Sequence, residues 1–221
     1  MKNNQDIIKY YDEYLQKSNH FALSPLMQHA QQIWDSILQK AILFYSTPSL
    51  LSQFLQNDIN NEHEFTIFKQ LSAKLNTDGY IYSYEWDQLL FGRDDMPHSL
   101  LQALIHYEQL NKEEETFVNQ ILHSKLGVYE IIDYQLDDGI IILEDIFLHQ
   151  QHLVYDELLL LDVCANIHSK YLFTRLLPIQ NYWIMTSFEI YIDSSIIQAL
   201  KKSSPQFDLQ VSNQLWKTLH R

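Results

Sequence analysis

The sequence has few residues of three kinds, and each shortage excludes a class of protein. The 221 residues include one cysteine, Cys164, so an internal disulfide and a stapled secreted scaffold are excluded. Only 4 residues are glycine, and none stands in the G-x-G or G-x-x-x-x-G-K spacing of a loop that binds nucleotide phosphates. Basic residues are also scarce, with 15 Lys plus Arg against 28 Asp plus Glu and a net charge of −13. Because binding to nucleic acid relies on Lys and Arg opposite the phosphates, we expect no nucleic-acid partner.

Long hydrophobic runs are missing as well. The densest apolar stretches, residues 41–45 and 158–161, are far shorter than the ~20 residues that cross a bilayer. The amino-terminal residues are polar and lead into an amphipathic segment, which differs from the apolar core of a signal peptide. We therefore expect a cytoplasmic protein with no membrane partner.

Helical periodicity dominates the first part of the chain. In residues 6–15, apolar side chains recur at the three- and four-residue spacing of one helix face. Ser24-Pro25 and Thr47-Pro48 each predict a helix start, with the hydroxyl residue as cap and proline in the first turn. Asn111 and Glu114 have the spacing of a capping box. Further helices are predicted over residues 62–75, 97–110 and 111–122, and residues 82–91 form a short aromatic segment that ends at Gly92.

The pattern changes at Gly127, where short runs rich in β-branched and aromatic residues replace the helical spacing. Asp137-Asp138-Gly139 predicts a hairpin turn between the first two runs. After the runs, Ser194 and Ser195 begin a short helix, and a last helix is predicted over residues 211–220. Strands are predicted over residues 128–134, 139–147, 153–155, 172–177 and 182–186.

Together these patterns predict an α+β protein. An N-terminal α-helical bundle over residues 1–125 is followed, over residues 126–221, by a small antiparallel β-barrel or sheet and a short helical tail. The chain shows no internal repeat and no low-complexity linker, so we expect the two parts to pack together.

A resemblance to a known family rests on five segments. Together with the residues between them, these segments cover about half of the chain. They are YEWDQLLF (84–91), SKLGVYEI (124–131), LEDI (143–146), FTRLLP (173–178) and YWIM (182–185). In their order the chain resembles a family of uncharacterised bacterial proteins, in which a helical region precedes a small β module and some members end in a zinc-binding SEC-C motif. With Cys164 alone, this sequence has no SEC-C site. The resemblance implies an order of structural elements and no activity.

The most metal-like spacing is His149-x-x-His152. Two interpretations are open: the histidines and nearby carboxylates bind a divalent metal, or residues 148–152 form a solvent-facing loop between two strands. The loop is favoured, because a catalytic helix of this kind carries a glutamate directly after its first histidine. The carboxylates in question are Glu144, Asp145, Asp156 and Glu157.

Two other groups have a structural and a catalytic interpretation. Cys164 and His168 stand four residues apart with Asp162 nearby, which suits a thiolate–imidazole pair, but an apolar alternation around Cys164 favours a buried thiol. The acid pairs Asp94-Asp95 and Asp137-Asp138 are explained by turns, in which aspartate bonds to its own backbone.

Arg175 lies inside an apolar run, where its charge needs a partner. A structural ion pair with Asp145 or Glu130 of a neighbouring strand is favoured over a bound carboxylate or phosphate. Trp183, beside Tyr182, either forms an aromatic wall next to Arg175 or belongs to the core.

The strongest signal is the distribution of charge. Residues 126–169 contain no Lys or Arg, whereas residues 170–221 contain six basic and three acidic residues, so a charge of −9 is followed by one of +3. A surface of one sign attracts partners of the opposite sign. A merely solubilising surface is the other interpretation. The nine acids are Glu130, Asp133, Asp137, Asp138, Glu144, Asp145, Asp156, Glu157 and Asp162.

These observations predict a non-enzymatic protein-interaction module whose contact surface is the acidic β module. They predict no catalytic residue, metal ligand or cofactor. The candidate binding residues are Arg175, Glu144, Asp145 and Trp183. One alternative is an inhibitor or immunity protein that neutralises a basic partner such as a nuclease toxin. A second alternative is a metal-dependent enzyme that uses His149 and His152.

Overall fold

The described residues form two units. Residues 30–123 make up the helical unit, and residues 25–29 with 124–219 belong to the barrel unit. The predicted helix over residues 6–15 and the predicted turn at Asp137-Asp138-Gly139 lie outside the described residues, as does Ser24. The structure is a computed structural model that describes residues 25–59, 61–78, 84–93, 95–122, 124–135, 140–155, 170–204 and 206–219.

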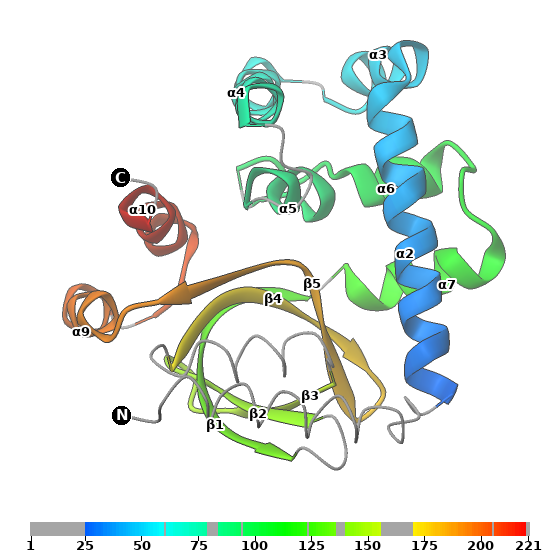
Figure 1. The fold of residues 1–221 in the computed structure, drawn as a ribbon. Helices are drawn as coiled ribbons and strands as arrows, with labels where there is room; N and C mark the ends of the chain where they lie inside the picture. Colours follow the sequence, from blue (N-terminus) through cyan, green and yellow to red (C-terminus); the bar gives the residue numbers. More distant parts are fainter. Residues whose placement is uncertain are drawn as a thin grey trace. The chain divides into compact units, whose positions relative to one another are not determined.

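Most helices of the helical unit (Figure 1) follow the apolar spacing of the sequence and bury one face in a common core, whereas the helix Tyr84–Phe91 is buried on all sides. Within the described residues, no helix is both long enough and apolar enough to span a membrane. The helices are α2 (Pro25–Ser46), α3 (Pro48–Asn57), α4 (Glu62–Asp78), α5 (Tyr84–Phe91), α6 (Leu100–His106) and α7 (Lys112–Ile121).

Local capping sets where several helices begin. The predicted capping box of α7 is confirmed, because the Asn111 side chain accepts hydrogen bonds from the backbone N–H groups of Glu113 and Glu114, both at 2.9 Å. Helix α6 begins later than predicted, since Ser99 and Gln102 form a capping box of their own. Thr47 precedes α3 but makes no side-chain cap; its hydroxyl donates to the Leu43 carbonyl at the end of α2.

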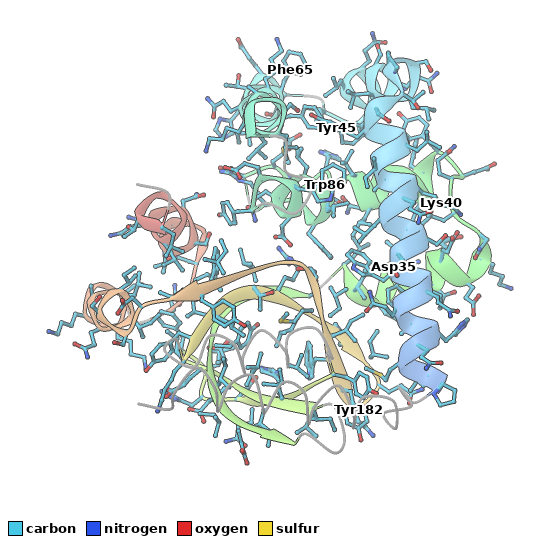
Figure 2. All side chains as sticks on the ribbon, viewed as in Figure 1. Asp35, Lys40, Tyr45, Phe65, Trp86 and Tyr182 are labelled. Carbon is cyan, nitrogen blue, oxygen red and sulfur yellow. The ribbon has the colours of Figure 1, made fainter. Side chains whose placement is uncertain are left out.

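Aromatic side chains fill much of the helical core. Phe54 of α3 lies between Phe44 of α2 and Phe68 of α4, with ring centroids 6.3 and 5.9 Å apart. Tyr45 at the end of α2 packs edge-on against Trp86 of α5, as Figure 2 shows. Burial of such rings is the main source of stability for short helices, which are marginal alone.

The five strands of the barrel unit form a closed barrel in the order β1-β2-β3-β5-β4 (Figure 1). The α+β class and the barrel are therefore as predicted. One pairing differs from the antiparallel expectation: β3 and β5 run parallel, with Val154 opposite Trp183, and this contact closes the ring. The strands are β1 (Lys125–Gln135), β2 (Ile140–Asp145), β3 (Gln151–Tyr155), β4 (Tyr171–Ile179) and β5 (Tyr182–Ile192).

Alternate side chains of all five strands meet in one apolar cluster inside the barrel. Ile131, Trp183 and Tyr191 pack against this cluster from its margin. The buried members are Tyr129, Ile141, Leu143, Val154, Leu172, Leu176 and Met185.

Two helices follow the barrel, α9 (Ser194–Ser203) and α10 (Leu209–Leu219). Asp193 caps α9 by accepting from the backbone N–H of Ser195. The segment between the helices is tied to the barrel unit by Phe207, whose ring lies 5.8 Å from that of Phe147 and 6.0 Å from that of Phe173. The predicted helical tail is therefore confirmed as two short helices.

Candidate functional site

The outward side chains of β1, β2 and β3 form two rows that cross the three strands. In the first row, Glu130 of β1 stands opposite Glu144 of β2, which stands opposite Gln151 of β3. In the second row, Asp133 stands opposite Ile142, which stands opposite Leu153. We call these six residues, with Ile132, the acidic face. Ile132 lies where the β1–β2 register shifts between Ile131 and Asp133.

The acidic face combines carboxylates with apolar side chains that are open to solvent. Ile132 is 46% exposed and Leu153 is 39% exposed. Leu148, in the turn between β2 and β3, is 54% exposed. Three of the five exposed large hydrophobic residues of the described chain thus lie in these strands and their connecting turn. Apolar side chains gathered within a charged surface are typical of a contact area for another molecule.

Like charges directly opposite one another destabilise a sheet, and Glu130 faces Glu144 in this way. The Glu144 carboxylate is 3.3 Å from His149 Nδ1 and accepts from Gln151 Nε2 at 3.4 Å. The hydrogen bond with His149, then that with Gln151, and the nearby charges of His149 and Lys201 hold the pKa of Glu144 below its usual value. Glu144 is therefore ionised at neutral pH and contributes a negative charge to the face.

The structure places Asp145 in a different role from that predicted. It is buried, and its Oδ1 accepts from the backbone N–H groups of Phe147 and Leu148, both at 2.8 Å. This is the bonding of an aspartate turn. Asp145 therefore shapes the β2–β3 turn, and its carboxylate lies beneath the surface that Glu144 presents.

Arg175 is buried at the register shift of the β4–β5 pair. Its Nη1 donates to the backbone carbonyl of Ser124, 2.6 Å away, at the start of β1. Its positive charge also acts on the buried hydroxyl of Tyr129. Burial raises the pKa of Tyr129, the charge of Asp145 adds to the rise, and Arg175 opposes it. Arg175 thus lies among groups of its own barrel and ties β4 to β1.

Trp183 lies at the margin of the barrel core, not in an exposed wall. Its ring centroid is 4.7 Å from that of His152, and the other side of His152 meets Tyr129 at 5.8 Å, both edge to face. Burial lowers the pKa of His152, and the charge of Asp145 opposes this shift. The three rings join β1, β3 and β5 across the inside of the barrel.

His149 and His152 are separated by this arrangement. His149 is in the turn, 70% exposed and paired with Glu144, whereas His152 belongs to β3 and stands opposite Leu143. The predicted loop over residues 148–152 is therefore too long by two residues, since Gln151 and His152 are in the strand. Among the residues that the structure describes, no three His, Cys, Asp or Glu side chains are grouped to hold a metal ion.

Several candidate residues lie outside the described part of the chain: Cys164, His168 and Asp162, as well as Asp94. Of the nine acids in residues 126–169, Glu130, Asp133 and Glu144 are on the acidic face and Asp145 is buried. The other five (Asp137, Asp138, Asp156, Glu157 and Asp162) also lie outside the described residues.

Three residues of this region were not identified from the sequence. Ile132 and Leu153 were not singled out from the sequence, because an outward apolar side chain in a strand has the same sequence signal as an inward one. Tyr129 was also missed, and its signal is the neighbouring Gly127: a Cβ atom there would lie 2.7 Å from the Tyr129 ring. The glycine gives the ring room to lie along its own strand.

Comparison with known proteins gives one match. Residues 51–214 match a family of unknown function, DUF7986. The matched range begins in α3 and ends in α10, so it includes both units. No curated protein and no solved structure matches the chain. That the chain belongs to an uncharacterised family is thus confirmed, and its bacterial origin and the link to SEC-C proteins stay predictions.

Proposed function

Since the chain belongs to a family of unknown function, DUF7986, we propose its function from the geometry of its barrel: it is a non-enzymatic protein-interaction module. Its contact surface is the acidic face, and its partner is a polypeptide segment that carries Lys or Arg together with apolar side chains.

One observation carries this proposal: carboxylates and exposed apolar residues lie in two neighbouring rows across the same three strands. Glu130 and Glu144 gain from basic side chains opposite them, because such a partner replaces their mutual repulsion with attraction. Leu153 and Ile132 supply apolar area that a partner removes from water. The acids favour a partner with positive charge. The leucine and isoleucine favour a partner that also carries apolar side chains.

The partner's basic character also follows from the chain's own charge distribution. Residues 126–169 contain no Lys or Arg, so Lys125, the first residue of β1, is the one basic residue in the three strands. Lys201 of α9 acts on Glu144 only as its weakest influence, after the bonds with His149 and Gln151. An acidic surface of this kind speeds the encounter with a basic partner.

The test is an NMR titration of the ¹⁵N-labelled full chain with two peptides, one of alternating Lys and Leu and one of alternating Glu and Leu. We expect the Lys–Leu peptide to shift the amide signals of both rows of the acidic face. Added salt weakens this binding, because exposed charges are screened. The Glu–Leu peptide is expected to leave the signals unchanged.

Two matched variants distinguish an effect of the acidic face on peptide binding from an effect of the chain's net charge. In the triple variant Glu130→Gln, Asp133→Asn, Glu144→Gln, we expect roughly tenfold or more loss of affinity, since each removes a favourable charge contact. The control changes three exposed acids of the helical unit, Asp35→Asn, Glu62→Gln and Glu115→Gln, and alters net charge equally. Equal loss in both variants, or no shift at millimolar Lys–Leu peptide, would overturn the proposal. Circular dichroism confirms that each variant is folded.

A further inference from the structure

The helical unit contains a cleft of about 440 Å³ that the barrel's proposed function does not use. It lies between the end of α3, the length of α6 and the end of α7. This volume is within the range of small-molecule sites. The apolar part of its lining is Phe54, Ala103, Ile105 and Leu122, and the polar side chains are Asp58, His98, Ser99, Gln102, His106 and Asn119.

Asp58 stands at the C-cap of α3, which is an unfavourable place for a carboxylate. The carbonyl end of a helix carries a partial negative charge, so an acid there is repelled and a cation is attracted. One Asp58 oxygen accepts from the Tyr107 hydroxyl at 2.8 Å. Burial, and then this hydrogen bond, raise the pKa of Tyr107, so the phenol keeps its proton and holds the carboxylate at the cleft.

His98 is the second polar group with a defined orientation. Its Nδ1 lies 3.0 Å from Oε2 of Glu64, a carboxylate whose side chain is 6% exposed, while His98 itself is 42% exposed. Glu64 is fixed in turn, because its backbone N–H donates to Asn61 Oδ1 at the start of α4. In the neutral ring, a carboxylate that accepts the Nδ1 proton leaves Nε2 without a proton, as an acceptor. Glu64 is thus a positioning residue for His98.

Amide groups complete the polar lining. Gln102 uses its oxygen to accept from the backbone N–H of Ser99, at 3.0 Å, which leaves its NH₂ group for a ligand. Among the described residues that line the cleft there is no Lys or Arg. The lining therefore suits a ligand without negative charge.

We propose that this cleft is a binding site for a small organic amine with a hydroxyl group. The ammonium group pairs with Asp58, the apolar body lies over Ile105 and Leu122, and the hydroxyl donates to His98 Nε2. Phosphates and carboxylates are excluded, because Asp58 and the carbonyl end of α3 repel them.

Two probes of the same size and opposite charge test this ligand class. Tyramine carries a phenol ring and an ammonium group, and 4-hydroxyphenylacetate carries the same ring with a carboxylate. In an NMR titration of the full chain, we expect tyramine to shift the side-chain amide signals of Gln102 and Asn119 and the ring signals of His98. Failure of tyramine to bind at about 5 mM (a free energy weaker than about −3 kcal/mol), or equal binding of the two probes, would overturn the proposal.

Substitutions in the cleft test which of its side chains contact tyramine. Asp58→Asn keeps an acceptor for Tyr107 but removes the charge, and His98→Gln removes the imidazole. Each is expected to weaken tyramine binding roughly tenfold, as for loss of a charge-assisted hydrogen bond. Asp35→Asn, on an exposed position of α2 labelled in Figure 2, is expected to have no effect. Tyramine binding that survives both cleft substitutions would show that the site lies elsewhere.

Glu64→Gln tests the positioning role by a measurement that needs no ligand. In the wild type, ¹⁵N spectra of the neutral His98 ring are expected to show the Nδ1–H tautomer, because Glu64 accepts that proton. In the variant we expect a mixture of tautomers, with wild-type melting behaviour as the sign of an intact fold. An unchanged tautomer would overturn the role given to Glu64.

Discussion

At the scale of single residues, Gly127 and Tyr129 form a matched pair. The Tyr129 ring occupies the space in which a Cβ of residue 127 would lie, and the tyrosine is 3% exposed, so the ring has little room to move. The buried phenol also lies between the opposing charges of Asp145 and Arg175. A small residue in a strand thus determines how an aromatic residue fills the barrel.

Gly127→Ala is therefore expected to lower the free energy of unfolding by about 1–3 kcal/mol, the range for overpacking a core. Urea denaturation followed by circular dichroism measures this loss. The same substitution in a Tyr129→Leu background should cost much less, because the ring that the new methyl group meets is gone. Equal losses in both backgrounds would mean that the ring is not the obstacle.

His152 predicts a dependence of stability on pH. Burial lowers the pKa of His152 in the folded chain, with Asp145 opposing the shift, and Tyr129 and Trp183 lie on either side of the ring. In the unfolded chain the pKa is about 6.5. The unfolded state therefore binds more protons near this pH, so the free energy of unfolding decreases as pH falls below about 6.5.

The decrease in the free energy of unfolding below about pH 6.5 should disappear in His152→Phe. This variant keeps an aromatic ring next to Tyr129 and Trp183. Urea unfolding at several pH values between about 5 and 8 gives the slope of the free energy of unfolding against pH. His149→Asn is the matched control, because His149 is 70% exposed and in the adjacent turn. A slope that is unchanged in His152→Phe, or lost in His149→Asn, would contradict the assignment.

At the scale of elements, Glu114 links two helices. It closes the capping box of α7 by accepting from the Asn111 backbone N–H, and it also accepts from Ser36 and Lys40 of α2, at 2.7 and 2.5 Å. Figure 2 labels Lys40 on α2. Burial alone would raise the pKa of Glu114, but the bonds from Lys40, Asn111 and Ser36 together lower it. One carboxylate thus serves as a helix cap and as an interhelix contact.

Glu114→Ala is expected to destabilise the chain by about 1–3 kcal/mol, because it removes a cap and leaves polar groups of α2 without their acceptor. Glu115→Ala, on the exposed face of the same turn, should change stability by less than about 0.5 kcal/mol. Thermal and urea unfolding distinguish the two. Similar losses for both variants would show that the α2–α7 contact contributes little.

The elements also show what the sequence predicts well. The helix start at Asn111 was placed correctly, because its capping box joins residues close in sequence, but the capping box of Ser99 and Gln102 was missed. Strand ends were placed less well: β5 continues to Ile192, beyond the predicted residue 186. Its extension pairs with the first half of β4, and such pairing between distant residues leaves no local signal.

The acidic face illustrates the same limit. The charge run from Glu130 to Glu144 is plain in the sequence, but their direct opposition depends on register. That register includes a shift between Ile131 and Asp133, and a change of one residue exchanges inward and outward side chains. For the same reason the sequence left Asp145, adjacent to Glu144, either as a binding residue or as an ion-pair partner of Arg175, and the structure shows it buried in a turn.

At the scale of the whole molecule, each unit has a core of its own. Leu104 of α6 is fully buried within the helical unit, and Leu176 of β4 is buried in the barrel cluster. Separate cores are the basis of separate cooperative units.

We therefore expect Leu104→Ala and Leu176→Ala each to remove about 2–5 kcal/mol of stability from its own unit. Hydrogen exchange read by mass spectrometry on peptides of the full chain locates the effect. Faster exchange should be confined to residues 30–123 for the first variant and to the barrel for the second. Faster exchange throughout the chain in both variants would indicate a single cooperative unit.

The parallel contact between β3 and β5 has a consequence for the order of folding. Without it, the five strands form an open sheet in the order β3-β2-β1-β4-β5, in which every neighbouring pair is antiparallel. Such a sheet can assemble from its two hairpins, β1–β2 and β4–β5, before the ring exists. Closure then brings His152 against Trp183 as a late event, so substitutions at these two positions should speed unfolding while leaving the rate of folding nearly unchanged.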